Sequence, residues 1–143
     1  MNVTTLIEAR ASSDIISVDV DRPVREAVSL LAEKRIGALP VMSGGSVAGV
    51  FSERDVIYRL ASEGQACLDK RVGEVMTSPA ITIDRQTPIL KALSLMTRRR
   101  IRHLPVMDGD TMCGFISIGD LVKARLDQIE HEAEAMREYI QTA

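Results

Sequence analysis

A serine and an aspartate three residues apart occur twice in this chain, each time with a glycine three residues before the serine. The two sets are Gly49, Ser52, Asp55 and Gly114, Ser117, Asp120. A Ser-x-x-Asp pair is typical of a capping box, in which both side chains bond to free amides at the start of a helix. The same helix start offers amides and partial positive charge to an anion, and a neighbouring carboxylate can accept both hydroxyl groups of a ribose. The motif therefore predicts either two structural helix caps or two nucleotide sites.

The motif belongs to a longer internal repeat. Residues 35–55 align without a gap on residues 100–120, at a constant offset of 65 positions. Both stretches contain Leu-Pro-Val-Met, and the offset extends upstream to pair Ile16 with Ile81. Repeats that cannot bury their own apolar faces stack on a neighbour. The sequence therefore predicts a pseudo-two-fold pair of units whose seam can hold a ligand.

Each repeat is expected to form a strand, a helix, two strands and a second helix, because short β-prone runs and Gly-rich turns alternate with apolar stripes of helical spacing. The expected elements are residues 15–18, 24–33, 38–42, 47–51 and 53–62, then 80–83, 87–98, 103–107, 112–116 and 118 onward. A short polar connector is expected at residues 65–74.

We therefore expect a mixed α/β (α+β) fold made of two βαββα units packed through their sheets. The units are expected at residues 1–65 and 66–125, with a C-terminal helix extension at 126–143.

The last helix carries an apolar stripe with steps of four and three residues: Val122, Leu126, Ile129, Ala133, Met136 and Ile140. This 3.5-residue rhythm is typical of a coiled-coil seam. The stripe could instead pack on its own domain or on the N-terminal segment at residues 3–7. We expect a homodimer, because a pseudo-symmetric pair of units has few other surfaces that need so long a stripe.

Composition argues against several classes of protein. The net charge is −2 and the 143 residues include two Phe, two Tyr and no Trp, so a net basic surface or a stacking platform for nucleic acid is not expected, although a local basic cluster is still compatible with the sequence. No apolar run reaches the roughly 20 residues of a membrane span, and the first residues do not resemble a signal peptide. Cys67 and Cys113 lack metal-ligand spacing. We expect no nucleic acid partner, no membrane association and a cytoplasmic location.

No catalytic constellation is evident. The chain has no P-loop and no dinucleotide fingerprint, and His131-Glu132 lacks the second histidine of a metal motif. We therefore expect no enzyme activity, no metal and no required cofactor.

The paired βαββα units, the Ile-x-x-Leu-Pro-Val strands and the doubled Gly-x-x-Ser-x-x-Asp turns resemble the CBS domain, named after cystathionine β-synthase. Two in tandem resemble a CBS pair, or Bateman module, over residues 10–125 or so. The resemblance implies a regulatory, energy-sensing module that binds AMP, ATP, NAD(H) or a similar adenosine ligand in two clefts between the units. It also implies signalling through a dimer or an unidentified target protein.

The resemblance further implies which residues form each cleft. One cleft would use Ser117 and Asp120 with Ile16, Ile36 and Gly37 around the base, and the other would use Ser52 and Asp55 with Thr77, Ile81 and Ile101. Each cleft needs both repeats.

The two clefts are not expected to be equal. Arg102 and His103 precede the second Leu-Pro-Val, where related modules place phosphate-contacting bases, whereas the first repeat has Gly37 and Ala38. Arg54 of the first motif has Gly119 as its counterpart. On this basis we expect the Asp120 cleft to bind a phosphorylated adenosine more tightly. The run at residues 98–100 is expected to be mainly a solvated helix end.

Two other functions remain open from the sequence. The chain could be an interaction protein that needs no ligand, with the Ser-x-x-Asp pairs acting only as helix caps, or an enzyme on adenine nucleotides. Unchanged stability with every nucleotide would select the first, and turnover would select the second.

Overall fold

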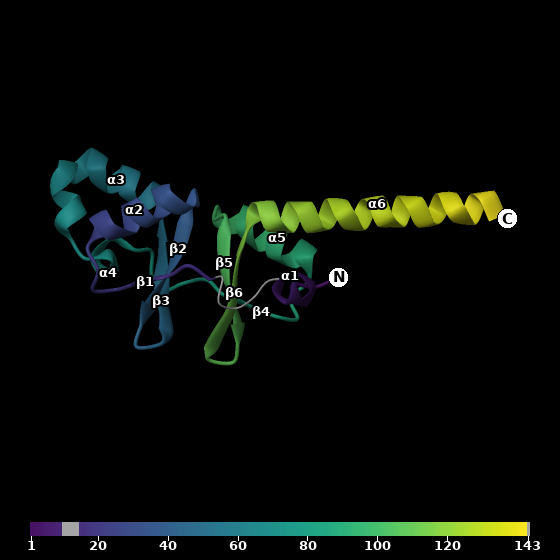
Figure 1. Ribbon diagram of the computed structural model, residues 1–143, viewed down its shortest axis with the longest axis horizontal. Coiled ribbons are helices and arrows are strands. Elements are labelled where there is room, and N and C mark those ends of the chain that lie inside the picture. The colour runs from purple at the N-terminus through teal and green to yellow at the C-terminus, as the bar shows by residue number, and fades with distance from the viewer. Residues whose placement is uncertain (10–14, 143) are drawn as a thin grey trace.

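The computed structural model describes residues 1–9 and 15–142. It contains two three-stranded sheets that lie side by side, with helices on their outer sides (Figure 1). Strands β3 and β6, one from each sheet, contact each other where the units meet. The predicted pair of units packed through their sheets is thus confirmed.

The two sheets share one topology. In the first sheet, β1 (Val18–Asp19) is parallel to β2 (Ala38–Ser43), and β2 is antiparallel to β3 (Ser46–Ser52). In the second, β4 (Ile83–Asp84) is parallel to β5 (His103–Asp108), and β5 is antiparallel to β6 (Thr111–Ser117). The register shifts once in each hairpin, at Val41/Met42 and at Val106/Met107. The repeat in the sequence is therefore also a repeat in strand pairing.

The first strand of each unit is shorter than predicted. Only two residues of β1 and two of β4 pair with the neighbouring strand. The residues just before them, which include Ile16 and Ile81, line cavities between the units instead of extending the ladder. The apolar residues in the first part of each predicted strand therefore face the seam.

The helices begin and end where the local sequence favours it. Their bounds are Thr4–Glu8 (α1), Val24–Lys34 (α2), Glu53–Glu63 (α3), Val72–Val75 (α4), Ile89–Arg99 (α5) and Ile118–Thr142 (α6). Proline stands at the N-cap of α2 and of α5, where its fixed φ suits the entry into a helix. Both helices end at an arginine in the left-handed region, Arg35 with φ 53° and Arg100 with φ 55°.

The expected polar connector at residues 65–74 is largely helical. A 3₁₀ helix, η2 (Gly64–Asp69), and α4 occupy it, and the side chains of Cys67 and Val72 are fully buried. Val72 and Val75 belong to the core of the first unit. In the second unit the N-terminal segment takes the equivalent role, since Val3 is fully buried in that core.

Helix α6 extends well beyond both units (Figure 1). Leu121 and Ala124 are buried against the second unit, but from Leu126 onward the apolar stripe is exposed. The interpretation that this stripe packs on its own domain is therefore wrong for the distal part of the helix. No helix in the described part of the chain has the length and apolar character needed to cross a bilayer.

Candidate functional site

Each Ser-x-x-Asp motif faces its own cavity between the two units. The cavity beside Asp55 has a volume of about 360 Å³, and the one beside Asp120 about 270 Å³. We call them the Asp55 cavity and the Asp120 cavity. Both contain residues from both sheets, so each is built jointly by the two repeats.

Both motifs form the predicted capping boxes. The amide of Ser52 donates to Asp55 Oδ2 at 2.9 Å, and the amide of Asp55 donates to Ser52 Oγ at 3.3 Å. The corresponding distances for Ser117 and Asp120 are 2.8 and 3.2 Å. The caps hold both carboxylates at the starts of α3 and α6, where the helix dipole is positive.

A bridge between the units fixes the Asp55 cavity. The hydroxyl of Thr77 donates to Asp55 Oδ1 at 3.0 Å, while the backbones of Thr77 and Val50 exchange two hydrogen bonds of 3.0 and 2.9 Å. A Cβ atom on Gly49 would lie 2.5 Å from the carbonyl oxygen of Thr77. Gly49 is therefore required for the close backbone approach that closes this side of the cavity.

Among the described residues, three arginines line the Asp55 cavity: Arg54, Arg100 and Arg102. Arg54 Nη1 donates to the backbone carbonyl of Arg100 at 3.1 Å, which ties the first turn of α3 to the loop before β5. All three side chains come from exposed residues, so they lie at the mouth of the cavity with their charges hydrated. This concentration of cations suits a phosphate group.

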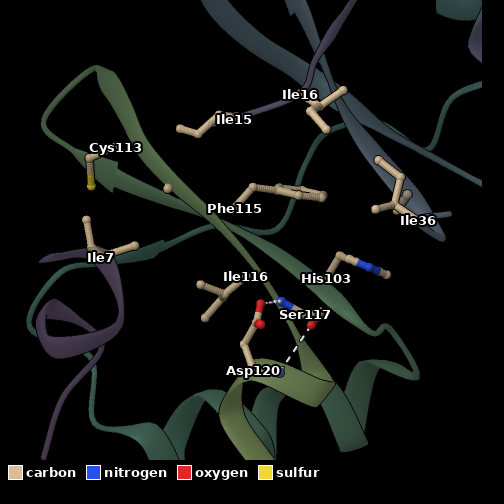
Figure 2. Close-up of a pocket in the computed structure, with 12 residues that line it drawn as sticks. Ile7, Ile15, Ile16, Ile36, His103, Cys113, Phe115, Ile116, Ser117 and Asp120 are labelled. Carbon is tan, nitrogen blue, oxygen red and sulfur yellow. Dashed lines mark hydrogen bonds between the residues drawn. The ribbon is translucent and has the colours of Figure 1, made fainter. Parts of the chain in front are cut away.

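The Asp120 cavity has a different lining (Figure 2). Among the described residues, its polar lining consists of His103, Ser117 and Asp120. The rest of the described lining consists of apolar side chains, a cysteine and a glycine: Ile7, Ile15, Ile16, Ile36, Ala38, Cys113, Gly114, Phe115 and Ile116. Figure 2 shows Ile7 and Cys113 at one end, with His103 and Ile36 at the other.

His103 lines both cavities. Its ring stacks on Phe115 with centroids 5.5 Å apart and planes inclined by 15°. Burial lowers the pKa of His103, and nearby Arg102 acts in the same direction, while Asp120 and Glu53 oppose the shift. The imidazole is therefore mainly neutral at pH 7.

Most of the predicted site residues line the cavity that was expected for them. Ser52, Arg54, Asp55, Thr77, Ile81 and Ile101 line the Asp55 cavity, and Ile16, Ile36, His103, Ser117 and Asp120 line the Asp120 cavity.

Two placements were wrong. Arg102 and Gly37 line the Asp55 cavity and not the Asp120 cavity. The carbonyl of Arg102 accepts from the amide of Ile118 in its own unit at 2.8 Å, while the loop that carries it contacts α3 of the other unit through Arg54. The expected ranking placed the Arg102 cation in the Asp120 cleft, but this side chain lines the Asp55 cavity.

Sequence reasoning missed several lining residues. Tyr58 lines the Asp55 cavity, and its spacing of three from Asp55 on a helix could have indicated this. The sequence predicts a solvated helix end at Arg100, but the left-handed turn that ends α5 places this residue at the cavity. Ile7 lies far from the Asp120 motif in sequence, and no local signal indicates that it reaches the cavity.

The fold and the doubled site define the class of protein. The family model of the CBS domain matches residues 7–62 and 72–127. The chain therefore belongs to the CBS-domain family and contains two CBS domains in tandem.

Known relatives share this arrangement. The chain is 36% identical over 126 residues to the CBS domain-containing protein CBSX3, mitochondrial, of Arabidopsis thaliana, covering 85% of this chain and 61% of that protein. A structure of a protein with CBS domains from Burkholderia ambifaria superposes with a TM-score of 0.81 at 36% identity, covering 89% of this chain and 95% of that one. The structure of CBSX2 in complex with AMP gives 0.77 at 27% identity, covering 90% and 98%.

Proposed function

We propose that this protein is a regulatory module that binds a phosphorylated adenosine ligand, such as AMP, ATP or NAD(H), in the Asp55 cavity. The observation that carries the proposal is that three arginines line the same cavity as a carboxylate placed at a helix start. An adenosine phosphate needs both kinds of group. The AMP complex of CBSX2 supports the choice of ligand class.

Each part of the ligand has a complementary group in this cavity. The Asp55 carboxylate, already oriented by Ser52 and Thr77, would accept hydrogen bonds from the ribose hydroxyl groups. Arg54, Arg100 and Arg102 would neutralise phosphate charge. The apolar side chains of Ile81 and Ile101 would enclose the base. Because the cavity is open to solvent at the arginines, ligands with one or several phosphates could be accommodated.

This proposal reverses the ranking expected from the sequence. That ranking assigned Arg102 to the Asp120 cleft, whereas Arg102 lines the Asp55 cavity. A phosphate gains charge-assisted hydrogen bonds where the arginines lie. We therefore propose the Asp55 cavity as the tighter site for phosphorylated ligands.

We further propose that the module acts as a homodimer through α6. The helix continues for 17 residues past Arg125 without packing on its own units, and the side chains of its stripe are 43% to 66% exposed at Val122, Leu126, Ile129, Met136 and Ile140. A helix without tertiary packing is marginally stable in water at this length. Pairing with a second copy would bury the stripe and carry a change in the clefts of one copy to the clefts of the other.

A target protein and a cytoplasmic location remain predictions, as does the lack of enzyme activity.

The test is ligand-dependent stability. Melting curves measured with AMP, ATP and NADH should show stabilisation by at least one of them, about 2.7 kcal/mol at a hundred times its dissociation constant. Arg102→Ala should weaken binding of that ligand about tenfold or more, because a charge-assisted hydrogen bond is lost.

Arg98→Ala is the matched control. It removes the same charge from the exposed end of α5, but Arg98 does not line either cavity. Equal losses for the two variants would show a general charge effect, and no stabilisation by any nucleotide would overturn the proposal. Conversion of the nucleotide on incubation would contradict the regulatory assignment.

A further inference from the structure

The exposed apolar stripe of α6 faces away from the body of its own chain. The side chains of Leu121 and Ala124 are buried against the second unit, whereas Val122 and Leu126 on the stripe are 43% and 55% exposed. Because an α-helix turns by about 100° per residue, these two stripe residues lie roughly 100–160° around the helix from the two buried ones. A second helix can therefore lie along the stripe without replacing the contacts of α6 with its own unit.

The stripe assigns a heptad position to each residue of the helix. Its alternating steps place the apolar residues at the two core positions of the heptad: Leu126, Ala133 and Ile140 at a, and Val122, Ile129 and Met136 at d. The positions that flank this core are mainly charged: Arg125, Glu132 and Tyr139 at g, and Lys123, Glu130 and Arg137 at e. Charges at e and g set the orientation in which two such helices pair.

A parallel pair in register brings opposite charges together at these positions. Each g residue then faces the e residue five positions further along the other helix. Arg125 would face Glu130 of the partner subunit, and Glu132 would face Arg137 of the partner subunit. The two-fold symmetry of the pair repeats both contacts on its other side, and every residue of the stripe is covered.

An antiparallel pair that covers the whole stripe brings like charges together instead. Reversing one helix turns the same flank of both copies toward each other, so that e faces e and g faces g. Glu130 would face Glu130 of the partner subunit, and Glu132 would face Glu132 of the partner subunit. Lys123 would face Arg137 of the partner subunit. Each of these contacts is repulsive.

Sliding the antiparallel helices by one heptad removes these repulsions but leaves part of the stripe uncovered. One direction of sliding leaves Met136 and Ile140 without a partner layer, and the other leaves Val122 and Leu126 without one. Those side chains are 43% to 66% exposed within a single chain, so the slide gives up apolar burial that the parallel pair retains.

The charged residues of the parallel contacts are not used for ion pairs within their own chain. Among the described residues, no salt bridge includes Glu130, Glu132 or Arg137. The Arg125 guanidinium donates to Gln128 Oε1 at 3.0 Å, which is a neutral acceptor. A second copy can therefore pair with these charges without breaking a salt bridge.

We propose that the stripe of α6 binds a second copy of this chain in parallel and in register, and that the Arg125–Glu130 and Glu132–Arg137 pairs between the copies select this orientation. The proposal rests on the proposed homodimer and adds its geometry. Both two-unit bodies then lie at the same end of the coiled coil. The amide of Ile118 at the start of α6 donates to the carbonyl of Arg102 at 2.8 Å, so a residue that lines the Asp55 cavity is bonded to the base of the coiled coil.

Disulfide cross-linking of the full chain tests the orientation. In Ile140→Cys the two new thiols face each other in a parallel pair, whereas in the fully overlapped antiparallel pair they lie about 27 Å apart. We expect most of this variant to form a linked dimer in a glutathione redox buffer. Glu138→Cys, on the opposite face of the helix, is the matched control and should be linked at least about tenfold less, because its thiols point apart. The wild type, with Cys67 and Cys113, gives the background.

A charge exchange tests the cause of the orientation. Glu132→Arg and Arg137→Glu each place like charges at both symmetric contacts, so each should raise the dissociation constant of the dimer about three- to tenfold at low salt. The variant that combines the two changes restores opposite charges and keeps the net charge. Its dissociation constant in analytical ultracentrifugation should return to within about twofold of the wild type.

The outcomes separate the orientation from the homodimer itself. If the wild type sediments as a dimer but Ile140→Cys is not linked above background, the parallel orientation is wrong and the homodimer stands. A combined variant as weak as the single ones overturns the role of the charge pairs. A wild type that sediments as a monomer at high concentration, or as more than two chains, overturns both proposals.

Discussion

At the residue scale, His103 connects the two sites. It lines both cavities, stacks on Phe115 and lies near charges from both units, with Asp120 and Glu53 favouring its protonated form and Arg102 opposing it. Burial outweighs the two carboxylates, so the pKa of His103 in the folded protein lies below 6.5. A proton on this ring would add charge at the junction of the clefts.

This shift predicts a pH dependence of stability. Between the lowered pKa of folded His103 and the unfolded value of 6.5, the unfolded chain binds more protons than the folded one. His103 therefore makes its full contribution to the free energy of unfolding above pH 6.5. This contribution is lost as the pH falls from 6.5 through the lower pKa of His103 in the folded protein.

Urea unfolding of the wild type and of His103→Gln across this range measures the effect. The difference between the two proteins should be constant above about pH 7 and should move against the wild type at lower pH. A difference that is independent of pH, or one that moves in favour of the wild type at low pH, would show that burial does not dominate at this position.

At the element scale, the bridge between β3 and the segment before β4 positions the Asp55 site. Val50 and Thr77 pair through two backbone hydrogen bonds, and the Thr77 side chain bonds to Asp55. This pairing is possible because Gly49 has no side chain at the contact. The site thus depends on a crossing between segments more than 20 residues apart in the sequence.

Gly49→Ala should therefore be costly. The new Cβ atom would lie 2.5 Å from a backbone oxygen, which cannot move without breaking the bridge, so we expect a loss of about 1–3 kcal/mol in the free energy of unfolding. Chemical denaturation measures it. Gly119→Ala is the comparison, since its Cβ atom has space and lies in a helix; that variant should be neutral or slightly stabilised. A Gly49→Ala protein as stable as the wild type would contradict the account of the bridge.

At the scale of the whole molecule, the protein consists of a two-unit body and one projecting helix (Figure 1). The body buries its apolar faces internally, with the two cores on the outer sides of the paired sheets. The projecting part of α6 has no such cover, and its exposed apolar side chains follow one stripe. This difference is the basis for the proposed homodimer.

Leu126→Glu with Ile129→Glu should make the protein monomeric in analytical ultracentrifugation, because two carboxylates would have to be buried at the seam. The control is His131→Glu with Gln141→Glu, which adds two carboxylates to the same helix at positions outside the stripe. The control should remain a dimer. A wild type that sediments as a monomer at high concentration would overturn the proposed dimer, and dissociation of both variants would indicate a general charge effect.

The sequence by itself determined the duplication, the order of strands and main helices within each repeat and the two capping boxes, because these depend on local spacing and on periodicities that a strand or a helix imposes. It also indicated eleven of the residues that line the expected cavity, because the repeated motifs and the family resemblance they carry point to them. Only the tertiary structure decided which cleft receives Arg102, that Arg100 turns toward a cavity, and that Ile7 forms a wall of the other. These contacts join segments that are distant in the sequence, and their geometry depends on how the two units cross, which no local pattern encodes.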